Sequence, residues 1–296
     1  MNKKYQYYWM AIRPRTLTAG VTPVIIGLSY SFYVHKTINI LIAALTLLCT
    51  LLMQMGTNLV NDYFDYKKGV DKNRKSGPIR VTQEKLLSEK EVKMAYRSCL
   101  FLSFLVGLYL MMIGGKVIII LGLSSLAMAY LYTGGPLPLA YFGLGEILAF
   151  LFFGPVAVFG TYYLQNLNFN PDVIILGTST GFLAAALMAI NNLRDRKDDL
   201  ASGKKTLANI FSIQTARFIP FICILLGSLI VPFYLVFKGL PFAVLVSILP
   251  FLLFKQTWLN IFSFNIDSSL NLILANIGKY MFIYGLLLSL GMHLSL

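Results

Sequence analysis

The sequence has few charged residues. Only 12% of its 296 residues are Asp, Glu, Lys or Arg, whereas 57% are hydrophobic. Roughly a quarter of the residues of a soluble domain are charged, so this composition excludes a soluble globular chain. The apolar runs are long and continuous, not alternating over about ten residues, and we therefore expect helices, not a transmembrane barrel, to cross a membrane.

Histidine and cysteine are scarce as well. The two histidines, His35 and His293, are predicted on the outer side of the membrane, away from the acidic residues, so we expect neither histidine acid–base catalysis nor histidine metal ligation. The three cysteines, Cys49, Cys99 and Cys223, lie inside apolar runs without metal-ligand spacing. They indicate apolar packing residues, not a disulfide framework or a zinc site.

The apolar runs predict an all-α, multi-pass transmembrane bundle that forms a single domain over residues 1–296. A helix needs about 20 apolar residues to cross the hydrocarbon layer. The basic, aromatic first fifteen residues and the absence of a small-residue cleavage pattern argue against a cleavable signal peptide. About nine spans are expected, near 16–34, 38–60, 96–113, 116–133, 143–164, 172–190, 217–237, 239–254 and 277–295.

The positive charges indicate how the chain crosses the membrane. With the amino terminus in the cytoplasm, only Lys36, Lys116 and Lys238 of the 25 Lys and Arg residues fall on the outer side. This distribution satisfies the positive-inside rule. Membrane topology therefore accounts for the formal charge of +13 without a nucleic-acid partner.

The positions of the acidic residues need a separate explanation, because the positive-inside rule does not favour them. All but Glu146 and Asp172 lie in predicted cytoplasmic loops. Asn61 precedes Asp65 by four residues at the end of the second span, and the same spacing separates Asn191 from Asp195 at the end of the sixth, so each pair shares a helical face. The repeat suggests two related halves, spans one to four and five to eight, around a central cavity open to the cytoplasm, with the ninth span added.

These two clusters suit a hard metal ion. Several carboxylates on one face repel one another unless a cation lies among them, and Asp and Asn oxygens favour Mg²⁺, which keeps coordination positions for water and substrate phosphate. The alternative is that these are ordinary charged helix ends and that the basic residues only orient the chain. The candidate ligands are Asn61, Asp62, Asp65, Asp71, Asn191, Asp195 and Asp199. The basic residues that would complete a diphosphate site are Lys67, Lys68, Arg74, Arg80, Arg194, Lys204 and Lys205.

The clusters resemble the two aspartate-rich motifs of the UbiA superfamily of intramembrane prenyltransferases. Asn61, Asp65 and Asp71 are similar to the first motif, and Asp195 with Asp199, followed by Gly203, to the second. Seven segments in order resemble, more narrowly, the 1,4-dihydroxy-2-naphthoate polyprenyltransferases. They are 13–17, 61–71, 132–136, 154–158, 160–163, 191–195 and 203–208.

The resemblance implies a Mg²⁺-dependent enzyme of the bacterial cytoplasmic membrane, with its amino terminus and active site cytoplasmic. It would transfer a prenyl group from polyprenyl diphosphate to dihydroxynaphthoate, releasing CO₂ and diphosphate and giving demethylmenaquinone. The implied catalytic residues are Asp65, Asp195 and Asp199. The implied substrate contacts are Asn61, Asn191, Arg15, Lys67, Lys68, Arg74, Arg194, Lys204, Tyr132 and Glu146, with Arg15, Lys204 and Arg194 as candidates for the acceptor carboxylate.

Several points stay open. Many members carry an Asp four residues after Asp65, where this chain has Gly69, so either Asp62 or Asp71 completes the first metal site. Glu146 is either a helix amino-terminal acid favoured by the helix dipole or a substrate-facing group. The acceptor alternatives are 4-hydroxybenzoate and homogentisate. A multi-pass transporter is the alternative from another class, although its polar site would be expected at the midplane of the membrane.

Overall fold

The regular structure of the protein is helical. The computed structural model describes residues 3–70, 77, 79–136 and 138–294. Within these ranges there is no strand, and a single isolated bridge joins Phe142 to Lys205. The expectation of an all-α chain is confirmed.

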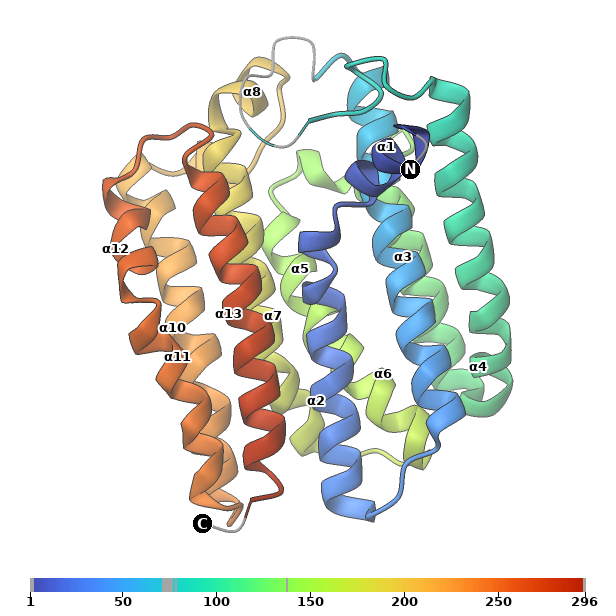
Figure 1. Ribbon diagram of the computed structural model, residues 1–296, viewed down its shortest axis with the longest axis vertical. Coiled ribbons are helices and arrows are strands. Elements are labelled where there is room, and N and C mark those ends of the chain that lie inside the picture. Colours follow the sequence, from blue (N-terminus) through green and yellow to red (C-terminus); the bar gives the residue numbers. More distant parts are fainter. Residues whose placement is uncertain (1–2, 71–76, 78, 137, 295–296) are drawn as a thin grey trace.

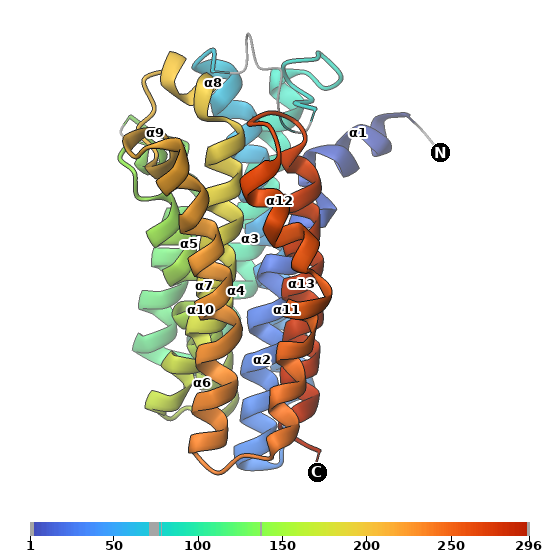
Figure 2. The same cartoon turned by 90° about the vertical axis from the view of Figure 1, so that its left-hand side faces the viewer.

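Long helices run side by side along the molecule and short segments join them at its two ends (Figure 1; Figure 2). The helices α1 and α8 and the start of α4 lie at the same end of the molecule. The elements are α1 (Lys3–Ile12), η1 (Pro14–Thr16), α2 (Thr18–His35), α3 (Ile40–Lys67), α4 (Glu89–Leu131), η2 (Leu139–Tyr141), α5 (Gly145–Phe153), α6 (Pro155–Asn166), α7 (Pro171–Arg194), α8 (Arg196–Ala201), α9 (Leu207–Ile210), α10 (Ile213–Phe237), η3 (Phe242–Ile248), α11 (Leu249–Leu253), α12 (Lys255–Ser263) and α13 (Leu270–Gly291).

The longest element, α4, is a hairpin of two helical arms. A straight helix of its 43 residues would be about 65 Å long, twice the thickness of the hydrocarbon layer. The rings of Tyr96 and Tyr130, near its opposite ends, are only 6.5 Å apart. The chain turns at Gly115, whose φ of 57° and ψ of −147° are open to glycine and disfavoured for other residues. This turn separates the predicted spans 96–113 and 116–133.

A second glycine breaks the next span into α5 and α6. Pro155 occupies the first turn of α6, where its missing N–H leaves no hydrogen bond unmade. A Cβ at Gly154 would lie 2.6 Å from the carbonyl oxygen of Gly177, so the break lets α7 pass close to this backbone. The predicted span 143–164 is thus present as two short helices packed on α7.

Six helices of the described ranges are long and apolar enough to cross a membrane. The number rises to eight if two bent pairs each count as one span: residues 3–16 with α2, bent by 50°, and residues 242–253 with α12, bent by 42°. A multi-pass membrane bundle is therefore confirmed. The predicted span 239–254 was too short, because the chain bends at Phe254 and continues as α12 to Ser263.

The helix α7 is the centre of the bundle. In its most apolar stretch 67% of the residues are buried, against 22% in the corresponding stretch of α3. The largest apolar cluster joins α7 to α2, α10 and α13, and includes the fully buried rings of Tyr162, Tyr280 and Tyr284. Packing on every side fixes the rotation of α7 about its axis, and with it the direction of the polar residues at its end.

Candidate active site

A cavity of about 1060 Å³ lies between α2, α3, the two arms of α4, α5, α6, α7 and α13. Its deeper part is apolar and is lined, among others, by Leu110, Met111, Ile118, Leu121, Phe152, Val156 and Leu164. The opposite part is polar. It is lined by Arg13, Asn58, Asn61, Asp65, Arg80, Tyr132, Asn191, Asn192, Arg194, Asp195, Asp198, Asp199, Lys204 and Asn271.

The two Asn and Asp clusters face this one cavity. Asn61 and Asp65 come from the last turns of α3, Asn191 and Asp195 from the end of α7, and Asp199 from α8. The hydroxyl of Thr133 donates a hydrogen bond to Asn61 Oδ1 and ties the end of α3 to the loop after α4. The structure therefore brings together residues that are far apart in the sequence.

Each of the three predicted catalytic carboxylates is buried and faces a cation. Asp65 pairs with Arg80 at 2.9 Å, and Asp199 pairs with Lys204 at 3.4 Å. Asp195 accepts two hydrogen bonds from Arg194, of 2.7 and 2.6 Å. A buried carboxylate without such a partner would be strongly destabilising, so these cations stabilise the acids in their buried positions.

Lys204 is the point on which the three carboxylates converge. Burial alone would lower the pKa of this ammonium group, but the pKa is raised above its usual value. The groups that raise it are Asp199, Asp65 and Asp195, in decreasing order of effect. A single ammonium whose pKa is raised by three carboxylates from three segments shows that these acids are gathered around one point of the cavity.

The donor atoms of this region fit Mg²⁺. Carboxylate and amide oxygens are hard ligands of the kind Mg²⁺ prefers. Among the described residues no three His, Cys, Asp or Glu side chains are close enough to hold a metal ion by themselves. Mg²⁺ commonly needs only one or two carboxylates beside water and substrate phosphates, so the arrangement suits a metal that arrives with a phosphate ligand.

The comparison with known proteins decides the family. The profile of the UbiA prenyltransferase family matches residues 20–266. Over 215 residues the chain is 36% identical to the 1,4-dihydroxy-2-naphthoate octaprenyltransferase of Haemophilus influenzae, a match that covers 70% of each chain. Over 230 residues it is 35% identical to the Escherichia coli protein of the same name, covering 75% of this chain and 74% of that one. The chain belongs to the UbiA prenyltransferase family.

The fold agrees with this membership, and the resemblance drawn from the motifs is confirmed. A structure of a UbiA homologue from Archaeoglobus fulgidus bound to GPP and Mg²⁺ superposes with a TM-score of 0.67. The two chains are 19% identical, and the match covers 96% of this chain and 99% of that one. At this identity the likeness concerns the fold alone.

In this UbiA-family chain, Asp62 does not line the cavity. It is 1% exposed, and its Oδ1 accepts hydrogen bonds from the backbone N–H of Thr82, at 3.1 Å, and from the Thr82 hydroxyl. Asp62 thus fixes the loop that carries Arg80. This placement does not support Asp62 as a metal ligand. The other candidate, Asp71, lies outside the described residues, as does Arg74.

The contacts of Arg194 differ from those expected of a residue that binds the acceptor carboxylate. It is 4% exposed, and besides Asp195 it donates to Asn191 Oδ1 at 2.7 Å and to Asn271 Oδ1 at 2.9 Å. Most of its donors are therefore used within the protein. Arg194 positions the polar residues of the site, and Asn271 of α13 is a cavity residue that no motif in the sequence marks.

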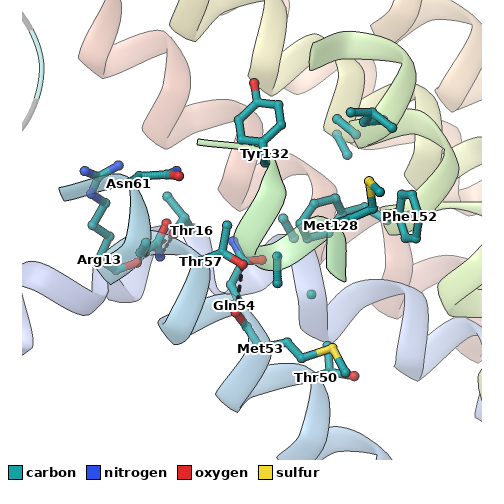
Figure 3. A pocket seen from close by; sticks show the side chains of 18 of the residues that line it. Arg13, Thr16, Thr50, Met53, Gln54, Thr57, Asn61, Met128, Tyr132 and Phe152 are labelled. Atoms are coloured by element: carbon teal, nitrogen blue, oxygen red, sulfur yellow. Dashed lines mark hydrogen bonds between the residues drawn. The ribbon is translucent and has the colours of Figure 1, made fainter. Parts of the chain in front are cut away.

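The remaining predicted basic residues divide by position. Lys67 points away from the cavity and pairs with the exposed Glu89 at 3.6 Å. Lys68 donates to the carbonyl oxygen of Thr133 at 2.8 Å, and burial lowers its pKa although Asp65 opposes that shift. Arg15 is exposed at the mouth of the cavity. The sequence prediction omitted Arg13, which lines the cavity beside Asn61 (Figure 3).

Glu146 and Tyr132 meet at the start of α5. Glu146 is buried in the first turn of this helix, and its Oε1 accepts a hydrogen bond of 2.9 Å from Asn192 Nδ2. It is Asn192 and not Glu146 that lines the cavity. Tyr132 does line it, and its hydroxyl lies 3.3 Å from the sulfur of Met188. In this structure Glu146 supports a cavity residue and does not itself line the cavity.

Proposed function

We propose that this protein is a Mg²⁺-dependent polyprenyltransferase that acts on 1,4-dihydroxy-2-naphthoate in menaquinone synthesis. One observation carries the proposal: the cavity joins a polar end, with buried carboxylates from α3, α7 and α8, to an apolar interior. A polyprenyl diphosphate has the same division into an anionic head and a hydrocarbon tail. The names of the relatives from Haemophilus influenzae and Escherichia coli support the acceptor and a long prenyl chain.

The proposal includes the membrane arrangement. Counting each bent pair as one span and each arm of the α4 hairpin as one gives nine spans, with the polar end of the cavity on the cytoplasmic side. The asymmetry of the Lys and Arg residues supports this orientation. We also retain a single domain with two related halves, because the ends of α3 and α7 bring the same Asn and Asp spacing to one cavity.

The residues at the polar end would bind the diphosphate head. Asp65, Asp195 and Asp199 would hold Mg²⁺ together with the amide oxygens of Asn61 and Asn191. Bound Mg²⁺ supplies positive charge that stabilises the departing diphosphate. The buried Lys204, with its raised pKa, stays protonated and adds a fixed charge to the same end of the cavity.

The reaction replaces a carboxyl group by a prenyl group. The allylic C–O bond breaks and its electron pair leaves with the diphosphate. The ring carbon that bears the carboxylate forms the new C–C bond, and the bond to the carboxylate then breaks to release CO₂ and restore aromaticity. No proton has to be removed from the ring. The product keeps both hydroxyls, so it is the quinol form of demethylmenaquinone.

The apolar interior of the cavity has a chemical task beyond binding the tail. An allylic cation is captured by any water molecule that reaches it. Walls such as Leu121, Phe152 and Val156 keep the region below the diphosphate poor in water until the acceptor ring attacks.

Turnover by the purified protein tests the proposal. The full chain in detergent is incubated with radiolabelled octaprenyl diphosphate and Mg²⁺, and separately with dihydroxynaphthoate, 4-hydroxybenzoate or homogentisate. We expect prenylated product and CO₂ with dihydroxynaphthoate only. Product with another acceptor but not with dihydroxynaphthoate would overturn the acceptor assignment, and no product with any acceptor would overturn the prenyltransferase assignment.

A further inference from the structure

One face of α3 forms a wall of the cavity from its polar end down into its apolar interior. The residues of this face are Thr46, Cys49, Thr50, Met53, Gln54, Thr57, Asn58, Asn61 and Asp65. Thr50, Gln54, Thr57 and Asn61 follow one another along the helix in Figure 3. Polar side chains therefore continue along α3 well beyond the carboxylates.

Most polar groups of this wall already have a partner within the protein. The hydroxyls of Thr46, Thr50 and Thr57 donate to the carbonyl oxygens four residues earlier, at 2.8, 2.9 and 2.9 Å. The hydroxyl protons of these threonines are therefore already used within α3. The amide of Asn58 donates to Ile12 O at 2.8 Å and to Thr16 Oγ1 at 3.0 Å.

Gln54 is the exception. It lines the cavity and is half-buried, and within the part of the chain that the structure describes its carboxamide makes no hydrogen bond. Its amide opens onto the cavity, so a molecule that fills the cavity without offering it a hydrogen bond would desolvate the amide at a cost in free energy. An amide at this depth is therefore best explained by a bound molecule that offers it a hydrogen bond.

The reactants differ in whether they can offer that bond. From the helical rise, Gln54 lies about 10 Å from Asn61 and about 16 Å from Asp65 along the axis. The diphosphate head is held at the level of the carboxylates, and the prenyl tail has no polar atom. Among the reactants, only the aromatic acceptor carries polar groups that could lie deeper in the cavity than the diphosphate.

The two hydroxyls of dihydroxynaphthoate are not equivalent. The hydroxyl at position 1 is adjacent to the carboxylate and forms an internal hydrogen bond with it. The hydroxyl at position 4 has no such neighbour and needs a partner from the protein. A neutral carboxamide, which both donates and accepts, suits this hydroxyl better than it suits a carboxylate, for which charged donors are preferred.

We propose that Gln54 is a specificity-determining residue that hydrogen-bonds the 4-hydroxyl of the acceptor and orients the ring below the diphosphate. The inference rests on the proposed function, since it takes dihydroxynaphthoate as the acceptor. Gln54 takes no part in bond making. It selects an acceptor with a hydroxyl opposite its carboxylated side and fixes which ring carbon faces the prenyl group.

The test compares two ligands with and without the amide. Dissociation constants of dihydroxynaphthoate and of 1-hydroxy-2-naphthoate, which lacks the 4-hydroxyl, are measured by anaerobic equilibrium dialysis with the full chain in detergent. For the unmodified protein we expect the analogue to bind about 5- to 10-fold more weakly, as one neutral hydrogen bond would give. In Gln54→Met, which keeps the length of the side chain, dihydroxynaphthoate should bind as weakly as the analogue.

Steady-state kinetics test the same inference in Gln54→Met and in a matched control variant. Gln54→Met should raise the apparent KM for dihydroxynaphthoate about 5- to 10-fold and leave that for octaprenyl diphosphate within about twofold. Gln256→Met, the same change on α12 outside the cavity lining, should alter neither constant. An unmodified protein that binds the two naphthoates equally would overturn the inference without any variant, and so would a Gln54→Met protein that still discriminates between them. Failure of the unmodified protein to prenylate dihydroxynaphthoate would instead refute the proposed function.

Discussion

Replacing Arg194 with Lys tests whether the active site needs only the positive charge of this residue or also the hydrogen bonds by which it positions its neighbours. Arg194 makes four hydrogen bonds, two to Asp195 and one each to Asn191 and Asn271. A lysine keeps the charge, but its single ammonium group cannot span three partners. We expect Arg194→Lys to insert into the membrane and to lose most of its activity, because Asp195 and Asn191 are no longer held in place.

The size of the loss follows from the contacts. The hydrogen bonds between the Arg194 guanidinium and the Asp195 carboxylate are charge-assisted, and such a bond contributes about 1.5–3 kcal/mol. Losing one of the two bonds to Asp195, together with one bond to an Asn, would weaken the positioning by about 3 kcal/mol. If the transition state loses all of this stabilisation, kcat falls about 100-fold, since each 1.4 kcal/mol corresponds to a factor of ten.

The assay measures kcat, the apparent KM for octaprenyl diphosphate and the Mg²⁺ concentration for half-maximal rate, in purified Arg194→Lys protein. The half-maximal Mg²⁺ concentration should rise along with the fall in kcat, because displaced oxygens hold a metal less well. Arg217→Lys is the matched control. Arg217 is a partly buried arginine on α10 whose guanidinium donates to the carbonyl oxygens of Ile261 and Phe264, away from the cavity lining.

Two results would refute the reasoning. The first is an Arg194→Lys protein that keeps more than half of the wild-type kcat, since positive charge alone would then suffice. The second is an equal loss of kcat in Arg217→Lys, which would mean that both arginines act through the stability of the bundle and not through the site.

Three further predictions address the metal, the acids and the fold. Excess EDTA should abolish prenyl transfer and added Mg²⁺ should restore it; full activity in EDTA would contradict the metal assignment. Asp65→Ala, Asp195→Ala and Asp199→Ala should each lower kcat at least about 100-fold, whereas the exposed Glu89→Ala should not, and similar losses in all four would indicate a folding role. Gly115→Ala should lower the free energy of unfolding by about 1–3 kcal/mol through backbone strain, seen as a lower Tm; an unchanged Tm would show that the turn accepts a Cβ.

The sequence predicted the long spans because hydropathy depends little on packing. The boundary inside α4 was visible as Gly114, Gly115 and Lys116 between two apolar runs. The bend at Phe254 was missed for the opposite reason. Lys255 and Gln256 follow it directly and lower the local hydropathy, so the apolar run ends where the structure continues into α12.

The site was predictable where a spacing repeats and not where a residue stands alone. Asn61 with Asp65, and Asn191 with Asp195, form a pattern that helix geometry places on one face. Asn271 and Gln54 are single polar residues in apolar helices, and only packing determines that they face the cavity. The same limit applies to Asp62, next to Asn61 in the sequence, because a rotation of about 100° per residue directs it to Thr82.

The charge balance of the polar end gives a physical reason why the proposed reaction would need a metal ion. Arg80, Arg194 and Lys204 pair with Asp65, Asp195 and Asp199, and these six groups together carry no net charge. A diphosphate brings several negative charges into this neutral, partly desolvated region, at a cost that the existing pairs cannot offset without breaking. On the proposed function, divalent cations that arrive with the diphosphate would supply the missing charge, and the carboxylates, already held in place, would share their remaining lone pairs with them.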